Sequence, residues 1–218
     1  MAPPAPVVRP FILVLAGVNG AGKSSVGGAM LEAHGLTWFN PDSYARELAG
    51  QLGLDVEQAS FRAWRHGRVL LEAALEQGRS HAFETTLGGR AIPALLERAS
   101  RTHDVMMIFV GLASPEQHIK RVRLRVAHGG HDIPEKNIRE RWVASRANLV
   151  RLLPLLARLQ VFDNSVQVRP GDEIPDPVLV LETNHGRVVF PDVTNPRALA
   201  GTPEWAQPMV QAATENAS

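Results

Sequence analysis

The residues from Gly17 to Ser24 match the pattern G-x-x-x-x-G-K-S/T, which is typical of a loop that binds phosphate groups. Glycines let successive backbone N–H groups curl around phosphate oxygens, and the helix that follows directs the positive end of its dipole at the same anion. Lys23 is expected to reach the β- and γ-phosphates of a nucleotide, and the Ser24 hydroxyl to coordinate Mg²⁺. The candidate nucleotide-binding residues are Gly17, Asn19, Gly20, Ala21, Gly22, Lys23, Ser24 and Ser25.

Motifs that other phosphate-binding classes need are missing from the sequence. A GTPase carries D-x-x-G and N-K-x-D, and neither occurs. An ATPase motor usually has an apolar strand that ends in an acid, whereas the most apolar run, Val105–Leu112, contains none. The runs that do end in an acid are His81–Glu84 and Gln160–Asp163. A small-molecule kinase is the class that remains.

Such a kinase needs a carboxylate that takes the proton of the acceptor hydroxyl, and cations that neutralise the migrating phosphoryl group. Asp42 follows a short strand predicted at Thr37–Phe39, which places it at the sheet edge where α/β proteins bind ligands. Asp42 also precedes a predicted helix, where an aspartate can act as the N-cap. Both interpretations, catalytic base and helix cap, stay open.

Five arginines gather in the stretch 120–141, around the run His128-Gly-Gly-His131. They are Arg121, Arg123, Arg125, Arg139 and Arg141. Basic residues around a Gly-Gly loop predict a lid that closes over phosphates, with a solvated basic face as the alternative. Two histidines without a third ligand do not predict a metal site.

Composition limits the remaining classes. The chain has 218 residues, 44% of them hydrophobic, which fits one α/β domain. The absence of cysteine excludes disulfides, thiolate zinc sites and cysteine nucleophiles. With 23 Lys+Arg against 22 Asp+Glu, the net charge of +1 gives no reason to expect nucleic acid. No segment approaches the roughly 20 apolar residues of a membrane span, so no membrane partner is expected.

The N-terminus is predicted to be a disordered, Pro-rich tail over residues 1–10. The apolar run Phe11–Val18 follows a single arginine and leads into the phosphate loop, which argues against a secretory signal. A cytoplasmic protein is therefore expected.

Strands and helices are predicted to alternate from residue 11 to about 163, which favours a P-loop kinase-like α/β fold: a parallel sheet with helices on both faces. Predicted strands are Phe11–Ala16, Thr37–Phe39, His81–Thr85, Val105–Leu112 and Gln160–Phe162. Predicted helices are 23–34, 43–52, 56–77, 92–101, 115–127 and 134–153.

The C-terminal part differs from this alternation. Val178–Leu181 and Val188–Phe190 flank the run Thr183-Asn-His-Gly186, which predicts a small β-hairpin. Residues 192–218 are Pro- and Ala-rich and are expected to be loosely ordered. The expected organisation is a kinase domain over 11–165, with a hairpin and tail over 166–218 packed on the same domain.

Five short motifs in this order resemble the zeta-toxin family of P-loop kinases, in its short, stand-alone branch. They are Gly17–Ser24, Phe39-Asn-Pro-Asp42, Phe83-Glu-Thr-Thr86, Arg121–His131 and Phe162-Asp-Asn-Ser165. The resemblance covers residues 11–165 and implies phosphorylation that depends on ATP and Mg²⁺. In the family's characterised members the acceptor is the 3′-hydroxyl of the amino sugar in UDP-N-acetylglucosamine, so a sugar nucleotide is the expected acceptor. An antitoxin partner is a further implication, of which the chain itself carries no sign.

The resemblance also implies roles for single residues. Asp42 is similar to the catalytic base, and Glu84 and Thr86 to residues that hold the acceptor. Arg125 and Arg139 are similar to the pair that stabilises the transferring phosphate. The arginine spacing leaves Arg121, Arg123 and Arg141 as alternatives for this pair. Glu84 has two other interpretations, namely support of Mg²⁺ together with Ser24 and capping of the next turn.

One position departs from the family. The family's arginine two residues beyond the threonine is Gly88 in this sequence, and Arg90 is the nearest substitute. The candidate acceptor-binding residues are Glu84, Thr86, Arg90 and His131. Three alternatives therefore stay open: a kinase of the same fold with another acceptor, such as a nucleoside, nucleotide or antibiotic; a nucleotide-gated binding protein without acceptor chemistry; and a nucleic-acid end kinase, which the balanced charge disfavours.

Overall fold

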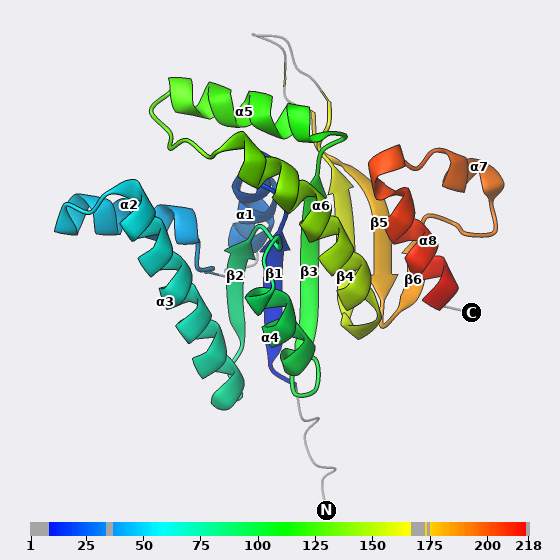
Figure 1. Cartoon of the computed structure of the whole chain (residues 1–218). Helices are drawn as coiled ribbons and strands as arrows, with labels where there is room; N and C mark the ends of the chain where they lie inside the picture. Colours follow the sequence, from blue (N-terminus) through cyan, green and yellow to red (C-terminus); the bar gives the residue numbers. More distant parts are fainter. Residues whose placement is uncertain (1–8, 34–36, 167–172, 174, 217–218) are drawn as a thin grey trace, which may run out of the picture.

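The computed structural model describes residues 9–33, 37–166, 173 and 175–216 of the chain. Most of the N-terminal stretch predicted to be disordered lies outside these residues. The described residues form an α/β fold in which a six-stranded sheet carries helices on both faces (Figure 1). This arrangement confirms the predicted fold class. Among the helices of the described residues, none has both the length and the apolar character needed to cross a membrane.

The sheet has the strand order β2-β1-β3-β4-β5-β6. The strands are β1 (Phe11–Ala16), β2 (His81–Thr85), β3 (Asp104–Gly111), β4 (Arg158–Asp163), β5 (Val178–Asn184) and β6 (Arg187–Phe190). The pairs β1–β2, β1–β3 and β3–β4 are parallel, whereas β4–β5 and β5–β6 are antiparallel. The predicted hairpin is thus present as β5 and β6, and it continues the main sheet beyond β4.

The register of the parallel strands brings their carboxyl ends to one edge of the sheet. Ala16 at the end of β1 is aligned with Thr85 of β2 and with Phe109 of β3. At the end of β3, Gly111 is aligned with Asp163 of β4. The loops that follow these four strands therefore lie side by side, as ligand-binding loops of α/β sheets do.

The helices cover the sheet unequally. They are α1 (Lys23–Ala33), α2 (Pro41–Leu52), α3 (Val56–Glu76), α4 (Ala91–Ala99), α5 (Pro115–Ala127), α6 (Glu135–Leu152), α7 (Pro196–Ala200) and α8 (Gln207–Asn216), with short 3₁₀ turns η1 (Leu153–Leu155) and η2 (Glu204–Ala206). Figure 1 shows α4, α6 and α8 in front of the sheet, α1 behind it, and α5 across its upper, carboxyl edge.

Successive residues of β1 point to opposite faces of the sheet, and both faces are buried. Ile12 and Val14 are fully buried in the main core, which also contains Leu149 of α6. Leu15 packs in a second cluster, against which Val26 of α1 lies. The phosphate loop therefore begins at the end of a strand that is fixed from both sides.

The expectation that residues 192–218 are loosely ordered is wrong for residues 192–216. Trp205, Met209 and Val210 are at most 4% exposed and belong to the main core. Helix α8 contacts α6, β5 and β6, so it covers the part of the sheet that the hairpin adds. Burying that apolar face is what orders the segment.

Two element boundaries also differ near residue 40. The strand expected at Thr37–Phe39 is reduced to one parallel bridge between Phe39 and Phe83. The helix expected from residue 43 begins at Pro41, because Asn40 caps it.

Candidate active site

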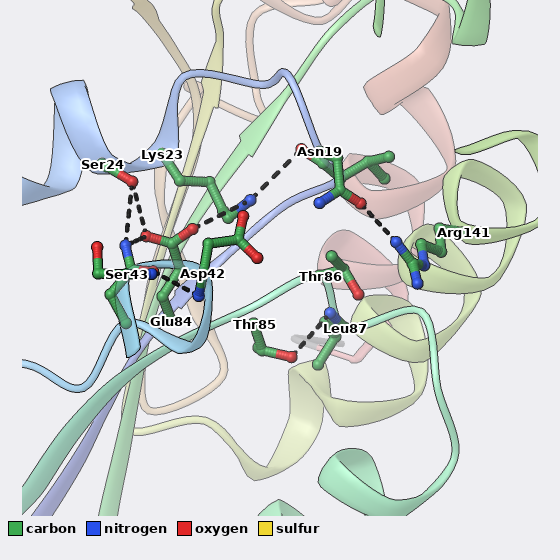
Figure 2. Close-up of polar contacts among 12 residues, drawn as sticks. Asn19, Lys23, Ser24, Asp42, Ser43, Glu84, Thr85, Thr86, Leu87 and Arg141 are labelled. Atoms are coloured by element: carbon green, nitrogen blue, oxygen red, sulfur yellow. Dashed lines mark hydrogen bonds and ion pairs between the residues drawn. The ribbon is translucent and has the colours of Figure 1, made fainter. Parts of the chain in front are cut away.

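The loop Gly17–Ser24 joins β1 to α1 and is held by a buried ion pair (Figure 2). Lys23 Nζ lies 3.4 Å from Glu84 Oε1, and each side chain is 7% exposed. Lys23 also approaches the carbonyl oxygen of Val18 at 3.5 Å. Because a buried charge without a partner is costly, the ammonium and the carboxylate stabilise each other at the base of the loop.

Ser24 and Glu84 provide the oxygen ligands that Mg²⁺ prefers. The Ser24 hydroxyl donates a hydrogen bond of 2.9 Å to Glu84 Oε2, so both groups lie at one point beside the loop. A hydroxyl and a carboxylate fit a Mg²⁺ site whose other ligands are phosphate oxygens and water.

Asn40 positions both Glu84 and Asp42. Its Nδ2 donates to Glu84 Oε2 at 3.0 Å and approaches Ser24 Oγ at 3.4 Å. Its Oδ1 accepts from the backbone N–H of Asp42 at 2.9 Å and of Ser43 at 3.1 Å, which makes Asn40 the N-cap of α2. The capping role that was open for Asp42 therefore belongs to Asn40, and the Asp42 carboxylate lies in the first turn of α2, beside the cleft.

Arg141 approaches the phosphate loop from α6. Its Nη1 donates a hydrogen bond of 2.8 Å to Asn19 Oδ1. Burial lowers the pKa of Arg141, and the charge of Asp42 acts in the opposite direction, so the two groups are electrostatic neighbours. Arg141 also lies against Gly88, where an added Cβ would come 2.7 Å from Arg141 Cγ. The missing side chain at residue 88 thus makes room for Arg141.

Arg125 and Arg139 lie on two different sides of the α5–α6 pair. Arg125 lines the same cleft as Asp42, and its Nη2 donates to the carbonyl oxygen of His131 at 3.1 Å. Arg139 does not reach this cleft: it pairs with Glu116 of α5 at 2.6 Å in an outer groove. Arg139 and Arg141 are two residues apart on a helix, about 200° around its axis, which explains their opposite directions.

Three other candidates lie apart from the cleft. Arg90 is exposed at the N-cap of α4, and Ser25 is exposed on α1. Thr86 lies in the turn after β2, where its Oγ1 accepts from the N–H of Gly88 at 3.4 Å. Figure 2 shows Thr86 between the end of β2 and Arg141.

The cleft itself has a volume of about 720 Å³ and a partly aromatic wall. Its lining residues are Ser24, Thr37, Trp38, Phe39, Asn40, Asp42, Ser43, Tyr44, Arg46, Glu47, Arg125, Gly130 and His131. Tyr44 stacks on His66 of α3 at 4.7 Å between ring centroids and contacts Phe39 at 5.5 Å. Aromatic rings beside charged groups suit a small molecule that carries both a ring and polar substituents.

His118 of α5 contacts the backbone of the phosphate loop. It is 1% exposed, and its Nδ1 lies 2.9 Å from the carbonyl oxygen of Asn19. Since a carbonyl only accepts, Nδ1 carries the proton. Burial lowers the pKa of His118 from 6.5 to about 4, so the imidazole is neutral at neutral pH.

The sequence patterns missed the parts played by Asn40 and His118. For Asn40 a pattern exists, because an asparagine directly before a proline is a common helix start. For His118 none exists, because its burial depends on where α5 crosses the loop.

A protein-family model and several solved structures match this chain. The model of the AAA domain family designated AAA_33 matches residues 12–149, which contain the phosphate loop, Asp42, Glu84 and the arginines from Arg121 to Arg141. Among curated proteins, none matches the sequence significantly.

Solved structures share the fold at low identity. The AvrRxo1-ORF1:ORF2 complex with ATP gives a TM-score of 0.58 at 18% identity, over 97% of this chain and 78% of that chain. A structure of the PezAT chromosomal toxin–antitoxin system of the human pathogen Streptococcus pneumoniae gives 0.57 at 16%, over 95% and 86%. A chain of the Pnkp1/Rnl/Hen1 RNA repair complex gives 0.53 at 18%, over 69% and 49%. The fold is P-loop kinase-like.

Proposed function

Since this chain belongs to the AAA domain family, with its phosphate loop inside the matched residues, we propose that it is an ATP-dependent kinase for a hydroxyl group of a small molecule. The observation that carries the proposal is the cleft shared by Ser24 of the phosphate loop and Asp42 of α2. A carboxylate whose helix is capped by another residue is available to accept a proton, and a nucleotide held by the loop would present its γ-phosphate beside it.

In the proposed reaction, Asp42 takes the proton of the acceptor hydroxyl while the acceptor oxygen forms a bond to the γ-phosphorus. The bond from the γ-phosphorus to the bridging oxygen of the β-phosphate breaks, and ADP leaves. Lys23 and the N-terminus of α1 hold the phosphates. Arg125 and Arg141 offset the negative charge of the transferring group, with Arg141 in the part that the resemblance gave to Arg139.

Ser24 and Glu84 would hold Mg²⁺, which when bound neutralises charge on the β- and γ-phosphate oxygens. Glu84 also contacts both Lys23 and Ser24 through its two carboxylate oxygens. These contacts restrict the two side chains of the loop, which would lower the ordering cost of nucleotide binding.

For the acceptor, we propose the sugar 3′-hydroxyl of UDP-N-acetylglucosamine or of a related sugar nucleotide. The resemblance to zeta toxins and the mixed aromatic and charged wall of the cleft support this choice. Gly88, which stands where the family has an arginine, favours a second candidate: a kinase of the same mechanism with another hydroxyl acceptor.

The deciding experiment is incubation with ATP, Mg²⁺ and UDP-N-acetylglucosamine, read by mass spectrometry. The expected product is the sugar nucleotide with one added HPO₃ unit. Demonstrated ATP binding without this product would discard the acceptor and direct the search to a panel of nucleosides, nucleotides and antibiotics. If no compound in a broad panel is phosphorylated, the kinase proposal itself fails, and nucleotide-gated binding becomes the better account.

The Asp42→Asn variant tests the base. Its turnover is expected to fall by about 10²- to 10⁴-fold, the usual contribution of a general base, with ATP affinity nearly unchanged. Asp55→Asn is the matched control, because Asp55 caps α3 at an exposed position and asparagine also caps well. Full activity of Asp42→Asn would remove Asp42 from the mechanism.

An antitoxin-like protein partner is a further part of this proposal. Two of the structural neighbours are described as a toxin–antitoxin system and as a two-protein complex, which supports it. Expression of the chain alone in a bacterium is expected to slow growth, and expression of Asp42→Asn is not. Normal growth with the active kinase would argue against a toxin and against the need for an antitoxin.

A further inference from the structure

The motif Phe162-Asp-Asn-Ser165, at the end of β4, has no part in the reaction above but touches the phosphate loop. Asn164 Nδ2 donates a hydrogen bond of 2.8 Å to the carbonyl oxygen of Ala21. The backbone N–H of Asn164 donates to the carbonyl oxygen of Gly111 at 3.0 Å. The carbonyl oxygen of Asn164 accepts from Arg121 Nη2 at 2.6 Å. Asn164 is thus held at both backbone groups while its side chain holds the loop.

Bonding of the Ala21 carbonyl has a direct consequence for phosphate binding. The C=O of Ala21 and the N–H of Gly22 belong to one planar trans peptide unit, so they point in opposite directions. When Asn164 fixes the carbonyl on its own side, the N–H is directed to the other side, where a phosphate oxygen can accept it. Rotation of this peptide would instead present a carbonyl oxygen to the phosphate and repel it.

Asp163 fixes the turn that carries Asn164. Its Oδ1 accepts from the N–H of Ser165 at 3.1 Å, from the Ser165 hydroxyl, and from Trp205 Nε1 at 3.3 Å. Ser165 Oγ in turn accepts from the N–H of Ala113 at 2.7 Å, which links the turn to the segment between β3 and α5. The acidic end of β4 therefore has a structural use in this chain.

Trp205 reaches this turn from η2, far beyond the residues that the family model matches. It is 4% exposed and lies directly over Gly111, where an added Cβ would come 2.2 Å from its ring. Its ring stacks near Phe109 with 6.4 Å between centroids. Its carbonyl oxygen accepts from Arg146 Nη1 of α6 at 3.4 Å. The indole N–H is the one polar group of this buried ring, and it is used on Asp163.

We propose that Asn164 is a positioning residue for the phosphate loop, and that Trp205 connects the C-terminal segment to ATP binding by holding the Asp163–Ser165 turn. The inference rests on the proposed function, since it assumes that the loop binds ATP. It predicts that the C-terminal segment, which lies outside the matched residues, is needed for nucleotide affinity and not for acceptor affinity.

The first test uses Asn164→Leu, which keeps the size of the side chain and removes the donor, and Asn164→Ser, which is too short to reach Ala21. Binding of a non-hydrolysable ATP analogue is measured by calorimetry, and the KM values for ATP and for the acceptor are measured separately. Both variants are expected to bind the analogue about 10-fold more weakly, because a buried carbonyl loses its partner. The KM for the acceptor is expected to stay unchanged.

The second test compares Trp205→Phe, which keeps an aromatic ring but loses the N–H, with Trp64→Phe on the exposed face of α3. Trp205→Phe is expected to weaken analogue binding by about 3- to 10-fold, the range for one lost hydrogen bond, and Trp64→Phe to leave it unchanged. Thermal unfolding of each variant shows how much of the chain is folded at the binding temperature.

The outcomes separate this inference from the proposed function. If the wild-type chain does not bind the analogue, the proposed function fails. If the wild type binds and the folded Asn164 variants bind equally well, the inference about Asn164 is overturned. If Asn164→Leu does not fold, Asn164→Ser and Trp205→Phe still decide the question, and equal affinity in them overturns the inference. A parallel rise in both KM values would show a general structural effect and would also overturn it.

Discussion

Helices α5 and α6 present arginines to two different sides of the molecule, and the two sets have different partners. On the outer side, Arg123 pairs with Glu135 and Arg139 with Glu116, and all four side chains are about half exposed or more. On the inner side, Arg125 donates to a backbone carbonyl and Arg141 to an asparagine amide. Among the ion pairs of the described residues, neither inner arginine has a carboxylate partner within 4.0 Å.

This difference indicates how the same residue type serves two purposes. Exposed ion pairs contribute little to stability, and their charge is already compensated. Neutral acceptors orient a guanidinium without cancelling its charge, and under the proposed function this leaves the charges of Arg125 and Arg141 available to an incoming phosphate. The direction of each side chain around its helix, and not the density of arginines, determines which of them faces the phosphate loop or the cleft.

The largest expected effect is the difference between removing an inner arginine and removing an outer one. Arg141→Gln is expected to reduce turnover by about 10³-fold, in the range of arginines that stabilise phosphoryl transfer. Arg139→Gln is expected to change turnover by less than about threefold, as for an exposed ion pair. Both are measured as initial rates at saturating ATP with the identified acceptor.

Arg141→Lys is the companion to this pair, since it keeps the charge but loses the planar fork. Partial activity in Arg141→Lys would show that charge at this position matters. Equal losses in Arg139→Gln and Arg141→Gln would break the distinction between the two sides, because the outer arginine would then act on the reaction as well.

A smaller effect is expected from His118, a buried residue of α5 that contacts the phosphate loop. The folded chain binds the imidazole proton with a pKa of about 4, and the unfolded chain with the ordinary value of 6.5. The unfolded state therefore takes up more protons between pH 6.5 and 4, and stability declines as the pH falls through that window. Over the whole window the loss is on the order of 3 kcal/mol.

The measurement is the free energy of unfolding of wild type and His118→Leu by denaturant at several pH values from 7 to 4. The variant is expected to show a flatter decline with falling pH than the wild type, because it lacks the proton that His118 takes up on unfolding. Identical slopes in wild type and His118→Leu would mean that His118 is not buried as a neutral ring.

These contrasts also show what could be predicted from the sequence. The strand Phe11–Ala16 and the phosphate loop were predictable, because a continuous apolar run followed by Gly17–Ser24 is a local pattern with one structural meaning. The contact of Arg141, and not of Arg139, with the phosphate loop was not predictable, because it depends on how α6 is rotated toward Asn19. Helical periodicity predicts which residues share a face of the helix, but it does not predict which face contacts the phosphate loop.

The C-terminal helices illustrate the same limit. Trp205, Met209 and Val210 lie in a stretch with prolines and alanines, whose local preferences are weak. Their order comes from the sheet surface that β5 and β6 add, and that surface exists only once the hairpin pairs with β4. Asn40 is the opposite case. Its capping role could be predicted from the local pattern Asn-Pro, but the neighbouring Asp42 is also a residue type that caps helices.

The smallest expected effect concerns the outer ion pair between Arg139 and Glu116. It tests whether this ion pair stays intact when ATP binds. The hydrogen bond from Arg139 lowers the pKa of Glu116, and a bond from the backbone N–H of Glu116 acts in the same direction. With a lowered pKa in the folded chain, the pair stabilises the fold above the ordinary pKa and loses this effect as the pH falls through the lowered value.

Arg139→Gln is expected to raise the Glu116 pKa toward its ordinary value, as measured by carbon-detected NMR titration, and high salt is expected to raise this pKa in part. Adding ATP to the wild type is expected to leave this pKa where it is, because the outer arginine has no contact with the cleft. A rise on ATP binding would show that Arg139 leaves Glu116 for the phosphates, and the lid would then have to rotate α6 as it closes.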